Sequence, residues 1–150
     1  MITEEYVSFE TAKLLKNKGF DVNTFIKYAN KEGATEKWYD DYRERMVQFN
    51  WDCGTLIILP TEPHDKYEIY GDTISAPTLQ MAMKWLMEVH KLGIFPSLYM
   101  NIIESNIIHA YATSIVNLNT YKLMTVDGMA RDTYNEACEA AIKYCLENLI

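Results

Sequence analysis

Three helix-start signals divide the chain into segments. Ser8, Thr78 and Thr133 each stand just before a stretch with helical hydrophobic spacing. A side-chain oxygen at that position accepts a hydrogen bond from a free backbone amide of the first turn. Short apolar runs of strand length lie between the helical stretches. We therefore predict an α+β fold, with a mainly antiparallel sheet and about three helices packed on one face as a two-layer sandwich.

The first helix is expected over residues 9–18. Gly19 can take the left-handed conformation that ends a helix, and Lys18 in the last turn suits the negative end of the helix dipole. Phe20 can then fold back on Leu15 as the apolar contact of a Schellman stop.

The second helix is expected to be capped by Ser75 or Thr78, because proline at position 77 is tolerated in a first turn. It should run to about Lys91 and stop at Gly93. One apolar stripe at helical spacing is formed by Leu79, Ala82, Met83, Leu86, Val89 and His90. Further apolar residues lie outside this stripe, so we expect the helix to be covered on more than one side.

The third helix starts with a capping box, in which Thr133 and Glu136 satisfy each other's backbone amides. It is expected to run to the C-terminus. Its predicted packing face consists of Ala137, Cys138, Ala141, Cys145 and Leu149.

Several segments have the length and composition of strands. The interpretation of residues 24–29 favours a strand over a helical turn. The apolar stripe at helical spacing over residues 36–47 predicts a helix there. The runs predicted as strands are Cys53–Leu59 with a return strand Tyr67–Tyr70, Leu98–Ile103, Ile107–Val116 and Tyr121–Val126.

The run Ile107–Val116 has two different faces. One face carries Ile107, His109, Tyr111, Thr113 and Ile115, and the other carries Ile108, Ala110, Ala112, Ser114 and Val116. Because the second set is mostly small, we expect it to be the face that a helix approaches closely.

Length and charge narrow the functional classes. A chain of 150 residues is expected to form a single globular domain, 1–150. Its net charge of -7 has the wrong sign for wrapping a phosphate backbone, so nucleic acid is an unlikely partner. No apolar run approaches the length of a membrane span, and no secretory signal is evident. Three cysteines without a paired motif fit a reducing cytoplasm.

Three segments together resemble a known family. They are Ser8-Phe9-Glu10-Thr11-Ala12-Lys13-Leu14-Leu15-Lys16, Ser75-Ala76-Pro77-Thr78-Leu79-Gln80-Met81-Ala82-Met83-Lys84-Trp85-Leu86 and Thr133-Tyr134-Asn135-Glu136-Ala137-Cys138-Glu139-Ala140-Ala141-Ile142-Lys143-Tyr144. The combination is similar to a family of small uncharacterised proteins from Bacteroides-type gut bacteria and their phages or mobile elements. The resemblance covers about a third of the chain and implies a setting, but no activity and no site residues.

Strong catalytic signatures are absent from the sequence. It contains no phosphate-binding glycine loop, no zinc-protease motif and no nucleophile elbow, so we expect no catalytic residues and lean against an enzyme. The histidines are far apart, and Cys138 and Cys145 are explained by helix packing, so neither a metal site nor a cofactor is expected.

Two groups of residues are candidates for binding. Tyr39, Asp40, Asp41 and Arg43 lie in the densest mixture of aromatic and charged residues, the composition typical of protein-binding hot spots. Tyr99, His109 and Tyr111 form the alternative group, since polar aromatic side chains on neighbouring strands could line a small-ligand site.

The function that these observations favour is a small cytoplasmic, non-enzymatic module, encoded by a phage or mobile element, that binds another protein. Homo-oligomerisation is compatible with it, through the apolar helix after Thr78. The alternative is a small-ligand-binding domain or an uncommon enzyme with its site near His109 and Tyr111.

Overall fold

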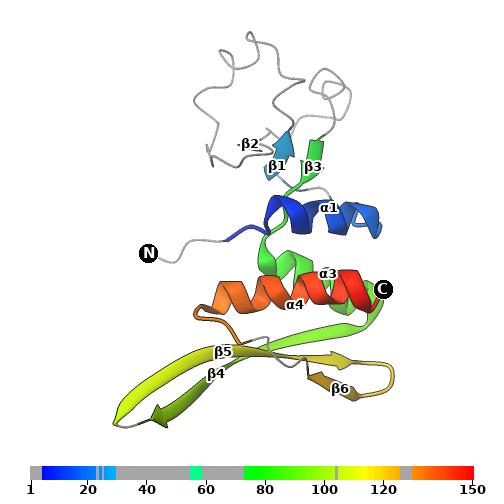
Figure 1. Cartoon of the computed structure of the whole chain (residues 1–150). Helices are drawn as coiled ribbons and strands as arrows, with labels where there is room; N and C mark the ends of the chain where they lie inside the picture. The colour runs from blue at the N-terminus through cyan, green and yellow to red at the C-terminus, as the bar shows by residue number, and fades with distance from the viewer. Residues whose placement is uncertain are drawn as a thin grey trace. The chain divides into compact units, whose positions relative to one another are not determined.

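The computed structural model describes residues 5–22, 24, 26–29, 55–58, 73–103, 105–125 and 130–150 (Figure 1). The chain divides into two compact units. Unit 1 comprises Met1–Val7 and Thr78–Ile150, and unit 2 comprises Ser8–Pro77. The organisation as one domain, expected from the length, stays a prediction.

Unit 2 contains one described helix and a small antiparallel sheet. Helix α1 is Phe9–Asn17, and strands β1, β2 and β3 are Ile26–Ala29, Thr55–Ile58 and Thr73–Ser75. The strand order is β2-β1-β3. The strands predicted within 24–29 and 53–59 are thereby confirmed, whereas β3 was not foreseen.

Both ends of α1 follow the predicted capping chemistry. The Ser8 hydroxyl accepts a hydrogen bond from the Thr11 amide at 3.2 Å. At the other end Gly19 has a φ of +90°, and the Phe20 amide donates to the Leu15 carbonyl at 2.9 Å. This is the hydrogen-bond pattern of a Schellman motif.

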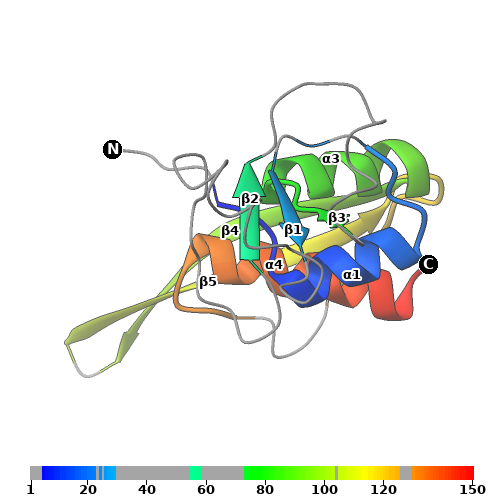
Figure 2. The same ribbon diagram turned by 90° about the horizontal axis from the view of Figure 1, so that it is seen from above.

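Unit 1 is a three-stranded antiparallel sheet with two helices on one face (Figures 1 and 2). Its elements are α3 (Leu79–His90), β4 (Leu92–Ile103), β5 (Asn106–Asn117), β6 (Lys122–Thr125) and α4 (Tyr134–Asn148). The strand order is β4-β5-β6, and both helices contact the sheet and each other. The predicted α+β class with antiparallel pairing is confirmed, with the strands distributed over two sheets.

The start and stop of α3 differ from the prediction. Thr78 is the cap, since its hydroxyl accepts from the Met81 amide at 3.2 Å, whereas Ser75 belongs to β3. Lys91 ends the helix with a φ of 58°. Gly93 lies in β4 instead, where it contributes to the sheet and not to a helix stop.

The apolar stripe of α3 is rotated relative to the prediction. Its buried residues are Leu79, Ala82, Trp85 and Leu86. The side chain of Val89 is 57% exposed, so its assignment to the packing face is wrong. The indole of Trp85 takes the interior position, because a side chain of that area gains most from burial.

The capping box of α4 is confirmed. The Glu136 amide donates to the Thr133 hydroxyl and the Thr133 amide donates to the Glu136 carboxylate, both at 3.2 Å. The buried face contains Ala137, Cys138, Ala141, Ile142, Cys145 and Leu146. Leu149 is the C-cap and only half-buried, which corrects the end of the predicted stripe.

The ladder between β4 and β5 is longer than predicted. It runs without a bulge from the Leu92–Asn117 pair to the Ile103–Asn106 pair. The predicted strand begins at Leu98, whereas β4 begins at Leu92 and contains Pro96. Proline is tolerated here because β4 is an edge strand.

The predicted helix 36–47 and return strand Tyr67–Tyr70 lie outside the described residues. Within the part of the chain that the structure describes, no helix is long and apolar enough to cross a membrane.

Replacing Thr133 by alanine removes one half of the capping box. We expect the free energy of unfolding to fall by about 1 kcal/mol, because a first-turn amide loses its acceptor. Urea denaturation checks this. The exposed Glu147→Ala variant in the last turn of the same helix is the control, and it should change stability by less than about 0.5 kcal/mol. Equal losses in both variants would contradict a specific contribution from the cap.

Candidate functional site

The sheet of unit 1 has an inner face that the helices cover. The opposed pair Ile94 and Ile115 is buried on this face, as is Thr113. The Tyr111 ring contacts the Tyr134 ring of α4, with centroids 6.1 Å apart. The residues of β5 that lie two and four positions before Ile115, Thr113 and Tyr111, therefore point toward the helices with it.

The outer face carries the remaining residues of the same strands. We define it by Gly93, Phe95, Ser97 and Tyr99 of β4, Ile108, Ala110, Ala112, Ser114 and Val116 of β5, and Leu123 of β6, from their register. Phe95, Tyr99, Ile108 and Leu123 are all more than half exposed. An open apolar sheet face in a folded unit is a candidate interaction surface.

The prediction that a helix approaches the small residues of β5 is wrong. Ala110, Ala112, Ser114 and Val116 lie on the outer face, and α3 and α4 pack on the other side. The large residues Tyr111 and Ile115 provide the apolar area that holds the helices there. Close approach by small residues is supplied by α4 itself, through Ala137 and Ala141.

Part of the hairpin extends beyond the helices. Each of its strands has twelve residues, about 40 Å, whereas α3 and α4 with 12 and 15 residues are about 18 and 22 Å long. Among the described residues, the backbone pairing of β5 on the side away from β4 extends toward the tip as far as the bridge between Tyr111 and Arg131. Residues 98–103 and 105–110, which we call the arm, project past this bridge (Figures 1 and 2).

The arm exposes apolar side chains on both faces. Leu98, Tyr99, Met100, Ile107 and Ile108 are between 51% and 68% exposed. Leu98, Met100 and Ile107 lie on the inner-face side, and Tyr99 and Ile108 lie on the outer face. Isolated apolar residues are normal on a surface, but a group of this size usually marks a contact site.

The hairpin is also almost free of charge. Residues 92–117 contain no lysine or arginine, and Glu104 and His109 are the only residues there whose side chains can carry charge near neutral pH, in a chain with 23% charged residues. Exposed edge strands usually carry charged side chains that prevent association. In the edge strand β4, Pro96 is the one residue of the kind that prevents another strand from pairing with it.

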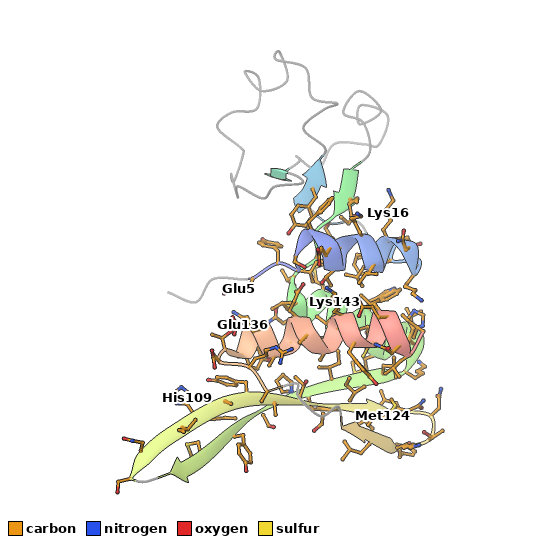
Figure 3. The ribbon with its side chains drawn as sticks, viewed as in Figure 1. Glu5, Lys16, His109, Met124, Glu136 and Lys143 are labelled. Atoms are coloured by element: carbon orange, nitrogen blue, oxygen red, sulfur yellow. The ribbon has the colours of Figure 1, made fainter. Side chains whose placement is uncertain are left out.

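The structure separates the residues proposed as a ligand site. Tyr99 lies opposite Ala110, whereas His109 lies opposite Met100 and Tyr111 opposite Leu98. Tyr99 is therefore on the outer face, and the two others are on the inner-face side, where Figure 3 shows His109. Tyr111 meets Tyr134 and not Tyr99.

One buried polar atom lies next to these residues. Thr113 is only 5% exposed, and its hydroxyl is inaccessible to solvent. The hydroxyl has no hydrogen-bond partner. An unpaired buried hydroxyl destabilises a fold because it loses its hydrogen bonds to water. It is the strongest polar feature of the inner face near Tyr111.

The cysteines of α4 are packing residues. Both Cys138 and Cys145 are buried and unpaired by disulfides. Burial raises the pKa of the Cys145 thiol to about 12 and raises that of Cys138. The pKa of Tyr134 is raised by burial and by the adjacent Cys138. Thiols held in the neutral form are poor nucleophiles and poor metal ligands.

No group of potential metal ligands forms a cluster among the described residues. The predicted protein-binding group Tyr39, Asp40, Asp41 and Arg43 lies outside them, and its role stays a prediction.

Sequence reasoning missed the surface residues Phe95, Leu98, Met100, Ile107 and Ile108. The sequence predicts strands that contain Leu98, Met100, Ile107 and Ile108, but it does not predict which of these side chains are exposed. The signal that could have identified them is the ratio of lengths, because helices of 12 and 15 residues cannot cover strands of twelve residues along their full extent.

No protein-family model matches the chain, and neither a curated protein nor a solved structure matches it. The resemblance to proteins of Bacteroides-type bacteria and their phages therefore stays a prediction.

Replacing Thr113 by valine keeps the shape of the side chain and removes the unpaired hydroxyl. We expect the free energy of unfolding to rise by about 1 kcal/mol. Thermal and urea unfolding measure the change. Thr113→Ala is the control, which removes a methyl group as well and should lower stability. A loss of stability in the valine variant would show that the hydroxyl has a partner.

The buried Cys145 thiol predicts a loss of stability at alkaline pH. Its pKa is about 12 in the folded chain, against the ordinary value of 9.0. Below pH 9 the thiol is neutral in both states and contributes no pH dependence. Between about 9 and 12 only the unfolded state releases the proton, so stability falls as pH rises. The midpoint of urea unfolding should therefore decline less steeply with pH in Cys145→Ala, and parallel declines would contradict the assignment.

Proposed function

We propose that this protein is a non-enzymatic protein-interaction module whose contact surface is the arm together with the outer face of the β4-β5-β6 sheet. The observation that carries the proposal is the apolar hairpin, which has a single acidic residue and is exposed on both faces beyond Tyr111. Such a surface is costly in water and gains free energy when a partner covers it.

The energetics of the hairpin support a bound state. Two-stranded ribbons without a covered face are marginal in water. Six apolar side chains more than half exposed, Phe95, Leu98, Tyr99, Met100, Ile107 and Ile108, leave on the order of 600 Å² of apolar surface in contact with solvent. At about 25 cal/mol per Å² this area corresponds to about 15 kcal/mol before the costs of association are subtracted.

The chemistry of the hairpin favours a protein over other macromolecules. A ribbon that enters a nucleic-acid groove contacts phosphates through lysine and arginine, and residues 92–117 contain neither. An anionic membrane surface would repel a chain with a net charge of -7. A neutral apolar patch on a protein requires no cationic side chains for binding and does not repel an acidic chain.

A small-ligand site near Tyr111 is the alternative function. The unpaired Thr113 hydroxyl is the observation in its favour, because a ligand could satisfy that group. Against it, Tyr99 points away from His109 and Tyr111, so the polar groups do not converge. We therefore place the interaction role first.

The proposed setting follows the sequence resemblance. A module encoded by a phage or mobile element and acting in the cytoplasm of a bacterial host would encounter host proteins there. Its acidic balance of 21 carboxylates to 14 basic residues keeps the rest of the surface from associating with nucleic acid.

Site-specific crosslinking tests the proposal. A photoreactive phenylalanine analogue replaces Tyr99 in the full chain, and crosslinks are collected in living cells and identified by mass spectrometry. We expect a discrete adduct with a protein, because Tyr99 lies on the proposed contact surface. The same analogue at Tyr121 is the matched control, since that side chain is 83% exposed but lies at the β5–β6 turn, outside the arm.

The two positions separate contact from mere exposure. Nonspecific collisions would label Tyr121 at least as strongly as Tyr99, because Tyr121 is the more exposed residue. Equal labelling, or no adduct at Tyr99, would refute the proposed contact surface.

A further inference from the structure

We infer that the partner covering the outer face is a second copy of this chain, so that the protein forms a symmetric dimer with two outer faces packed together. The inference rests on the proposed function and specifies the partner of that surface. A closed two-fold dimer requires a patch that is complementary to itself. The outer face has this property in shape and charge.

The shape consists of a ridge beside a row of small residues. Phe95 and Tyr99 are the large residues of β4 on this face, and they are about 13 Å apart along the strand. Their partners on β5 are Ser114 and Ala110. A two-fold axis places the aromatic ridge of one copy over the small row of the other, as in packed sheets whose side chains interdigitate.

The small row is suited to burial. Ala110 and Ala112 have no polar side-chain atom, and the Ser97 hydroxyl donates to the Ala112 carbonyl at 3.4 Å. That contact supplies the serine with an acceptor inside its own sheet. Gly93 contributes as well, because a β-carbon there would lie 2.8 Å from the Phe95 ring. The absence of that carbon lets the ring lie close to the strand.

The free edge of β4 is less suited to association than the face. Tyr111 exchanges both backbone hydrogen bonds with Arg131, so β5 residues in phase with Tyr111 turn their amides away from β4. Thr113 is in that phase and lies opposite Pro96, which places the proline nitrogen on the free edge. Because proline has no amide hydrogen, an added strand would lose a ladder bond there.

Charge and area are compatible with a pair of copies. None of the outer-face residues that we defined is an Asp, Glu, Lys, Arg or His, so two chains of net charge -7 meet where repulsion is weakest. The outer-face side chains that are more than half exposed, Phe95, Tyr99, Ile108 and Leu123, supply on the order of 400 Å² per copy, hence about 800 Å² in a pair. An interface of that size is small and corresponds to a weak dimer that dissociates readily.

Sedimentation equilibrium of the full chain tests the inference over about 1 to 100 µM, the range in which a modest interface dissociates. We expect a monomer–dimer equilibrium. Ala112→Phe adds apolar area but fills the small row, so the dissociation constant should rise at least about tenfold. Met100→Phe is the matched control, since it adds an aromatic ring to the other face of the arm and should leave the constant unchanged.

The outcomes are distinct. A tighter dimer in Ala112→Phe, an equal effect of Met100→Phe, or a monomeric wild-type chain would overturn the inference. Should Ala112→Phe fail to fold, the wild-type melting temperature decides, because it rises with protein concentration only when the folded state is a dimer. A monomer with a Tyr99 crosslink to a different protein would refute the dimer and leave the proposed function standing.

Discussion

The register between β4 and β5 is the constraint on which unit 1 depends. A slip of one residue would exchange the inner and outer faces, because side chains alternate along a strand. The register is fixed at its base by the bond from the Leu118 amide to the Lys91 carbonyl at 2.8 Å, and from the side by the Tyr111–Arg131 bridge. At the tip the chain reverses through Ser105, whose φ is 69°. Both helices pack against the face that this register selects.

The helices of unit 1 are shorter than the β4–β5 hairpin against which they pack. Helix α4 buries a continuous row from Ala137 to Leu146 against its surroundings. The β4–β5 hairpin continues well beyond the length of that row (Figure 1). The apolar residues past Tyr111 have the composition of a core without helices to cover them. This exposed surface is the one on which the proposed contact role depends.

Local chemistry was predictable from sequence, whereas the assignment of faces was not. The caps at Ser8 and Thr133 and the stop at Gly19 depend on residues within one turn, and the structure places each of them as expected. Lys91 takes a left-handed conformation that favours glycine, so Gly93 was mistaken for the stop.

Which face of β5 the helices cover depends on contacts with residues that are distant in sequence. Ala110 and Ala112 were expected under a helix because small residues permit close approach, but Tyr111 and Ile115 offered the helices more apolar area. For the candidate site, the same alternation that correctly grouped His109 with Tyr111 placed Tyr99 on the opposite side, which only the β4–β5 register reveals. The first half of β4 contains Pro96, a residue that is disfavoured in a sheet except on an edge strand. Whether a strand lies at an edge cannot be known from its own residues.

The path of the chain through unit 1 has a consequence for how this protein can change. Unit 1 is interrupted after Val7 and resumes at Thr78, and the two ends of the interruption are held together by the Tyr6–Thr78 bridge and the bond from the Leu79 amide to the Glu5 carbonyl at 3.0 Å. Unit 2 is topologically an insertion whose entry and exit are adjacent. Substitutions, and even changes of length, between these two points need not disturb the hairpin register. The fold of the hairpin therefore does not require a fixed length of chain between Val7 and Thr78.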